Sequence, residues 1–132
     1  MGGPADALAQ PVTPEEAGRL LAFLTERAVP CCVAGHWTNL ICRDGGYRGV
    51  VLCLRRMRTI RVEEDPAGGG RITAQAGALL SELVGLCTEK AWAGLAFAAG
   101  IPGSLGGAVR MNAGAYGHDM QEVLRTVSVM DP

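Results

Sequence analysis

Glycine is the residue that most constrains the fold of this chain. It accounts for 19 of the 132 residues, about twice its usual share of roughly 7%. Most of the glycines lie within residues 44–49, 68–70 and 94–117. Because glycine has no side chain, clusters of this kind between apolar segments indicate backbone that turns sharply or approaches another group closely. We therefore expect glycine-rich loops that face a ligand or a packed neighbour.

The length and composition predict one globular domain. Of the 132 residues, 48% are hydrophobic, and the formal net charge is −1. A nucleic-acid binder or a membrane-surface binder would carry a basic excess, so neither class of partner is expected. No apolar run approaches the roughly 20 residues that span a bilayer, and no secretory signal is recognisable. We expect a cytoplasmic protein whose five cysteines are reduced, buried thiols.

The first half of the chain predicts a helix followed by short strands. Thr13-Pro14-Glu15-Glu16 combines a cap, a first-turn proline and a capping box, and a helix to about Arg27 should follow. Strands are expected at residues 31–34, 40–42 and 49–54. The run Arg55, Arg56, Arg58 and Arg61 is interpreted as a solvated strand edge, with phosphate binding as the weaker alternative.

The second half predicts a hairpin, a second helix and a closing strand. Ile60 and Val62, and then Ile72 and Ala74, alternate with polar residues on either side of a glycine turn. Leucines at helical spacing predict a helix from residue 79 to about residue 90, and residues 123–130 read as a strand. This order favours an α+β fold with a small parallel sheet beside an antiparallel one.

Two loops have the composition of anion-binding cradles. The first loop is Gly35-His36-Trp37-Thr38-Asn39, in which successive backbone N–H groups and a hydroxyl could face a pyrophosphate, although a plain turn is the commoner use of such a sequence. The second loop, residues 99–108, contains a Pro102-Gly103 turn and a Ser104 that can cap a short helix with free N–H groups. Its glycines would equally suit a tight crossing of helix and sheet.

The second loop belongs to a longer stretch that resembles a known family. Residues 94–117 are similar to the flavin-binding signature of the UDP-N-acetylmuramate dehydrogenase family, also called UDP-N-acetylenolpyruvoylglucosamine reductases. The segments that carry the resemblance are Gly100-Ile101-Pro102-Gly103-Ser104-Leu105-Gly106-Gly107-Ala108 and Met111-Asn112-Ala113-Gly114-Ala115-Tyr116-Gly117. Residues 2–7 resemble the family's N-terminal strand, and residues 35–44 resemble its first pyrophosphate loop and the strand after it.

The resemblance implies a fold, a reaction and a set of cofactor contacts. The implied fold is the two-subdomain FAD-binding domain of the vanillyl-alcohol-oxidase type, occupying residues 1–132. The implied reaction passes hydride from NADPH to FAD and then to the enolpyruvyl group of a UDP-sugar, in the synthesis of peptidoglycan precursors. The implied FAD contacts are Gly35, Thr38, Asn39, Ile101, Gly103, Ser104, Gly106, Gly107, Asn112, Gly114 and Tyr116.

The chain departs from the family pattern in three respects, one of which is that it begins within the N-terminal motif, without the Asn-Thr residues that usually precede it. Trp37 occupies the second glycine position of the first loop, and an indole there is expected to crowd the cradle and weaken FAD binding. The family's substrate domain corresponds to no part of residues 1–132, so neither catalytic nor metal-binding residues are assigned, and the chain alone is expected to be inactive. His36 and His118 are interpreted as solvent-facing or hydrogen-bonded side chains.

Two other functions remain open on the sequence. One is a truncated nucleotide-binding module with weak or no flavin binding and no turnover. The other is a different flavin oxidoreductase of the same superfamily, against which the Ala113-Gly114-Ala115-Tyr116-Gly117 run argues.

Overall fold

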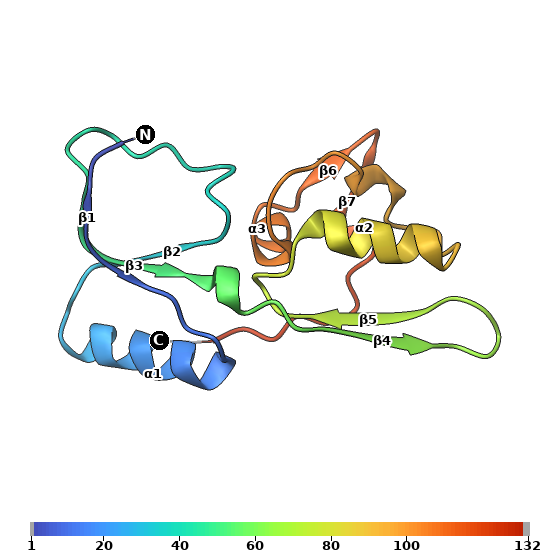
Figure 1. Ribbon diagram of the computed structural model, residues 1–132, viewed down its shortest axis with the longest axis horizontal. Coiled ribbons are helices and arrows are strands. Elements are labelled where there is room, and N and C mark those ends of the chain that lie inside the picture. Colours follow the sequence, from blue (N-terminus) through green and yellow to red (C-terminus); the bar gives the residue numbers. More distant parts are fainter. Residues whose placement is uncertain (1, 131–132) are drawn as a thin grey trace.

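The computed structural model describes residues 2–130 and contains both of the expected sheets. Strands β1 (Ala5–Ala9), β2 (Cys31–Ala34) and β3 (Tyr47–Cys53) form a parallel sheet in the order β1-β3-β2 (Figure 1). Strands β4 (Ile60–Glu64) and β5 (Gly70–Ala74) form a separate antiparallel hairpin. The α+β expectation is therefore confirmed.

Helix α1 (Pro14–Glu26) connects β1 to β2 and begins where the sequence predicts. Thr13 is the N-cap, and its hydroxyl accepts a hydrogen bond from the N–H of Glu16 at 3.2 Å. The Glu16 carboxylate accepts from the N–H of Val12 at 2.8 Å, one residue before the usual partner in a capping box. Figure 1 shows α1 beside one face of the parallel sheet.

The connection from β2 to β3 corrects the expected strand at residues 40–42. Adjacent parallel strands start at the same end of the sheet, so the chain must return along its length between them. Residues 35–46 make this return without forming a strand, and the Ile41 side chain is 98% exposed. The apolar residues at 40 and 41 therefore lie on a loop.

The second half of the chain packs around a single buried cluster. Helix α2 (Leu80–Glu89) lies over the hairpin (Figure 1), followed by 3₁₀ helix η2 (Ala96–Ala98), helix α3 (Leu105–Arg110), strands β6 (Gly114–Ala115) and β7 (His118–Asp119) and 3₁₀ helix η3 (Met120–Glu122). The buried residues of this cluster come from α2, η2, α3 and η3, and they are Leu80, Leu83, Phe97, Ala98, Ala108 and Met120. The hairpin contributes the partly buried Ile60 and Ile72, while Arg61 and Glu63 are exposed. The predicted hairpin, with one face against the core and the other exposed to solvent, is thus confirmed.

Two further sequence expectations are corrected. Residues 123–130 pair with no other strand of the described chain, and Val127 and Val129 are 52% and 81% exposed. Arg55 and Arg56 lie in 3₁₀ helix η1 (Leu54–Arg56), which ends β3, so the arginine run is not one strand edge. The apolar residues of the segment 123–130 misled in the first case, because a strand also needs a partner.

The cysteines only partly meet the expectation of burial. All five are free, and Cys53 and Cys87 are buried. Cys31 and Cys32 are half-buried, and Cys42 is exposed because it lies on the return loop. Burial raises the pKa of the Cys31 and Cys87 thiols, which favours the unreactive protonated form.

Candidate functional site

The first loop, residues 35–39, follows β2 at the carboxyl end of the parallel sheet. Its backbone N–H groups donate no hydrogen bond to any described residue. The loop is nevertheless held in place, because the Cys53 thiol, at the end of β3, donates to the carbonyl oxygen of Gly35 at 3.6 Å. Unused amides at the end of parallel strands are a common setting for an anionic ligand.

The structure packs the first loop against the second loop. The Thr38 hydroxyl donates to the carbonyl oxygen of Pro102 at 3.3 Å. A Cβ atom added at Gly103, where φ is +119°, would lie 2.6 Å from Thr38 Oγ1. A Cβ atom at Gly35 would collide with the Ser104 hydroxyl. The contact between the loops therefore brings together four of the residues implied by the resemblance: Gly35, Thr38, Gly103 and Ser104. At positions 35 and 103 the contact leaves room only for glycine.

The expected free N–H groups of the short helix are not found. Ser104 caps α3, as predicted, by accepting from the N–H of Gly107 at 3.4 Å. The N–H of Leu105 donates to the carbonyl of Ala78 at 2.8 Å, and the N–H of Gly106 donates to that of Ala76, also at 2.8 Å. The segment before α2 thus takes up the donors that an anion would need. No sequence pattern predicts this contact, because residues 76–78 lie far from α3 along the chain.

Gly106 and Gly107 have different surroundings. A Cβ atom at Gly106 would lie 2.7 Å from the Cβ of Ala76, so this glycine is required for packing. At Gly107 the nearest atom would be Ser104 Oγ at 3.5 Å, and the residue is exposed. Gly107 therefore borders open space in which a ligand could lie against the backbone.

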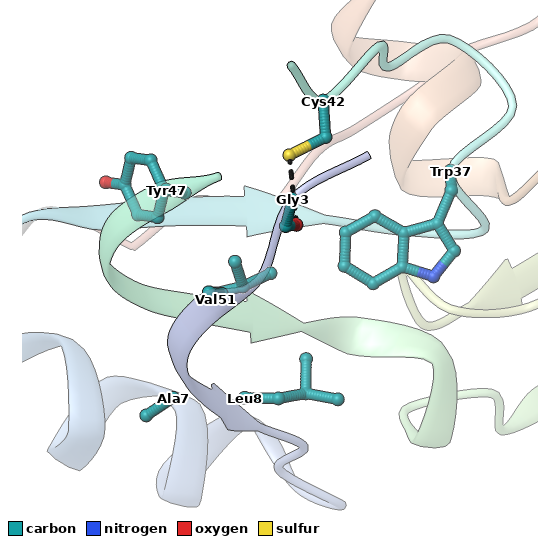
Figure 2. A pocket seen from close by; sticks show the side chains of 8 residues that line it. Gly3, Ala7, Leu8, Trp37, Cys42, Tyr47 and Val51 are labelled. Carbon is teal, nitrogen blue, oxygen red and sulfur yellow. Dashed lines mark hydrogen bonds between the residues drawn. The ribbon is translucent and has the colours of Figure 1, made fainter. Parts of the chain in front are cut away.

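Trp37 occupies a glycine position of the family pattern and has a left-handed backbone conformation. Its φ is +61°, in the left-handed region that large side chains rarely adopt. Its indole lies beside β1 and lines a pocket of about 310 Å³ together with Leu8, Tyr47 and Val51 (Figure 2). The residue is 42% exposed. The side chain thus leaves the first loop on the side of β1, and the left-handed turn of the loop is kept.

The remaining residues implied by the resemblance are spread around the second loop. Ile101 packs against the buried cluster, and Asn39 is exposed. Asn112, with φ +43°, uses its amide to hold Asp119 and Gln121. Gly114 lies in β6, and Tyr116, with φ +57°, is 86% exposed in the turn that follows. The structure brings Asn112 and Gly114 together through Asp119, a residue that the sequence analysis did not single out.

His118 meets the expectation of a solvent-facing, hydrogen-bonded side chain, whereas His36 meets it only in part. Burial, with a smaller effect of the Arg55 charge, lowers the pKa of His36, and its buried Nδ1 has no hydrogen-bond partner among the described residues. His118 pairs with Glu122, Nδ1 to Oε2 at 2.8 Å, on the surface. No group of three or more potential metal ligands occurs within residues 2–130. The part of the chain that the structure describes also contains no helix long and apolar enough to cross a membrane.

These residues fit a flavin dinucleotide on two observations. The first loop offers unused backbone donors, and the second loop contains Gly100 and Gly107, at which an added Cβ atom would meet no close neighbour. Glycine at positions 35 and 103 lets the two loops meet without side chains between them. Such a junction is suited to a ligand that lies across both loops.

Comparison with known proteins also indicates an FAD-binding domain. A family described as "FAD binding domain" matches residues 5–132. A UDP-N-acetylenolpyruvoylglucosamine reductase of Syntrophus aciditrophicus is 48% identical over 99% of this chain, and one of Lactiplantibacillus plantarum is 45% identical over the same share. A reductase of the same name from Clostridioides difficile is 41% identical. The chain spans 42% of the length of each of these three relatives. Because the family covers almost the whole chain, this protein belongs to the FAD-binding domain family.

Proposed function

We propose that the chain is the FAD-binding part of an NADPH-dependent reductase that converts UDP-N-acetylenolpyruvoylglucosamine to UDP-N-acetylmuramate. The observation that carries the proposal is the junction of the two loops, where the unused N–H groups of residues 35–39 lie next to the Pro102-Gly103 turn. The relatives named above support the choice of reaction, since this chain is 41–48% identical to them over the segment that it matches. Peptidoglycan precursor synthesis in the cytoplasm would be the setting.

Each loop has a distinct role in this proposal. The backbone N–H groups of the first loop would bind the pyrophosphate, and the exposed Asn39 would add a polar contact. Gly107 would leave room for the dinucleotide to lie against α3. FAD supplies the chemistry, because its ring can accept a hydride from NADPH and pass it on. The enolpyruvyl sugar and NADPH would be bound with the help of residues outside 1–132.

A nucleotide-binding module that binds flavin weakly, without turnover, is the second candidate. One observation favours it. The N–H groups of Leu105 and Gly106 and the Thr38 hydroxyl are all engaged within the protein. These are three of the donors that the second loop and its neighbour could have offered to a phosphate, so the first loop alone would have to supply most of the binding energy.

A titration with FAD separates the two candidates. Binding quenches flavin fluorescence and shifts the absorbance spectrum, and we expect saturation at one FAD per chain. ADP, which carries the pyrophosphate without the flavin, serves as the competitor. Gly85→Ala is the matched control variant, since no atom lies within 4 Å of a Cβ added at Gly85 in α2. Binding of ADP without detectable binding of FAD would favour the nucleotide-binding module, and binding of neither would reject both candidates.

A further inference from the structure

Asp119 contacts the 111–117 motif at two of the positions that the resemblance implicates in flavin binding. Its Oδ2 accepts a hydrogen bond from Asn112 Nδ2 at 2.8 Å. Its backbone pairs with Gly114 in the β6–β7 ladder, and a Cβ atom added at Gly114 would lie 2.8 Å from the Cβ of Asp119. Asn112 and Gly114 are thus held by one carboxylate residue that lies outside the motif.

The same carboxylate fixes a second point on the chain. Asp119 is the N-cap of η3, and its Oδ1 accepts from the N–H of Gln121 at 3.1 Å. That N–H also donates to Asn112 Oδ1 at 2.9 Å. Both oxygens of Asp119 and both ends of the Asn112 amide are therefore used within one closed network of three residues.

The network holds backbone that is otherwise unfavourable. Asn112 and Tyr116 have φ values of +43° and +57°, in the left-handed region. Asparagine tolerates this conformation, but tyrosine has no such preference. Met120, which is 2% exposed in the buried cluster, donates its N–H to the carbonyl of Ala113 at 3.1 Å and ties the network to the core. The turn that carries Tyr116 keeps its shape because both of its ends are fixed.

We propose that Asp119 is a positioning residue of the flavin site. It acts through Asn112 and Gly114 to hold the 111–117 motif in the conformation that the dinucleotide requires, and the Asn112 side chain serves this network and not the ligand directly. The inference rests on the function proposed above.

An exchange of the two side chains tests the proposal. Asp119→Asn removes one of the two acceptors that the network needs, and Asn112→Asp places two carboxylates against each other. The double variant, Asn112→Asp with Asp119→Asn, restores each donor and acceptor with the roles reversed. We expect each single variant to weaken FAD binding about tenfold and the double variant to return to within about threefold of the parent. Glu122→Gln is the control, since it alters the neighbouring surface pair with His118 and leaves the network intact.

Amide hydrogen exchange of residues 112–117 without FAD provides a second reading. We expect faster exchange in both single variants and protection restored in the double variant. Unchanged exchange in the single variants, no recovery in the double variant, or faster exchange without weaker FAD binding would each overturn the inference. A parent protein that does not bind FAD would instead reject the proposed function, and the exchange data would still decide whether Asp119 holds the motif.

Discussion

Single residues at the two loops are under steric constraints that differ even between neighbours. Gly106 is required by the adjacent Ala76, whereas Gly107 faces open space three residues after the Ser104 cap. Trp37 adopts a glycine-like φ of +61° beside a pocket lined by Leu8 and Val51. Of two neighbouring glycines, one is thus needed for packing and the other leaves space in which a ligand could lie.

Trp37→Gly tests the expectation that the indole crowds the cradle. The sequence favours tighter FAD binding by this variant, but the structure places the indole in the pocket beside β1 (Figure 2). We therefore expect the FAD dissociation constant to stay within about threefold of the parent, as measured by flavin fluorescence. The strain of the left-handed backbone, about 1–2 kcal/mol, would be relieved in the variant. A gain in affinity of tenfold or more would mean that the indole does crowd the loop amides.

Gly106→Ala should destabilise the fold. The new Cβ would lie 2.7 Å from the Cβ and 3.0 Å from the carbonyl oxygen of Ala76, so the backbone of one segment must shift. We expect a loss of about 1–3 kcal/mol in the free energy of unfolding, measured by denaturant titration. Gly107→Ala is the control, because its Cβ makes only an ordinary contact at 3.5 Å. Equal stability of the two variants would refute the assigned packing role of Gly106.

Gly107→Val should block FAD binding without unfolding the protein. The side chain would enter the space at the exposed face of α3 where the proposal places the dinucleotide. Gly85→Val introduces the same residue into α2, at another glycine with no close neighbour, and controls for the poor helix propensity of valine. Both variants should retain the native circular dichroism spectrum, and only Gly107→Val should lose FAD in a titration. If it binds FAD as well as the parent, the second loop is misassigned.

At the scale of elements, the sequence predicts best where local signals determine the structure. The cap and proline at residues 13 and 14 locate the start of α1, and alternation at Ile60 and Val62 locates the hairpin. The failures at residues 40–42 and 123–130 share a cause, since a strand depends on a partner that no local pattern reveals. For the same reason, the sequence could name the two loops as candidates but could not show that residues 76–78 occupy the donors of α3.

Thr13→Ala measures how much the cap contributes to α1. The Thr13 hydroxyl satisfies the N–H of Glu16, one of the four amides that a helix start leaves without a partner. Its loss should cost about 1 kcal/mol of stability, which corresponds to a fall of roughly 3–5 °C in the melting temperature for a chain of this size. Thr88→Ala is the control. Its hydroxyl bonds back to the carbonyl of Val84 within α2, an interaction that adds little to helix stability. An equal effect of the two substitutions would show that the cap is not needed.

At the scale of the whole molecule, the two loops of the proposed site contain backbone donors and glycines but few ionisable groups. The first and second loops contain one titratable side chain, His36. Burial lowers the pKa of this side chain, and its buried Nδ1 has no hydrogen-bond partner among the described residues, so the neutral form is favoured. The reductases that resemble this chain are more than twice as long as the segment it matches.

The last prediction concerns catalysis by residues 1–132 alone. We expect these residues to show no substrate-dependent oxidation of NADPH with UDP-N-acetylenolpyruvoylglucosamine, even when FAD is bound. A positioned general acid typically contributes 10²–10⁴-fold to a rate, and His36, whose Nδ1 is buried, is the one titratable side chain of the two loops at the proposed site. The loss of NADPH absorbance at 340 nm, at roughly micromolar protein with added FAD, measures the rate, and the full-length Syntrophus aciditrophicus relative is the positive control. A rate within tenfold of that relative would show that the chain contains a complete active site, and His36→Ala would then be the first variant to examine.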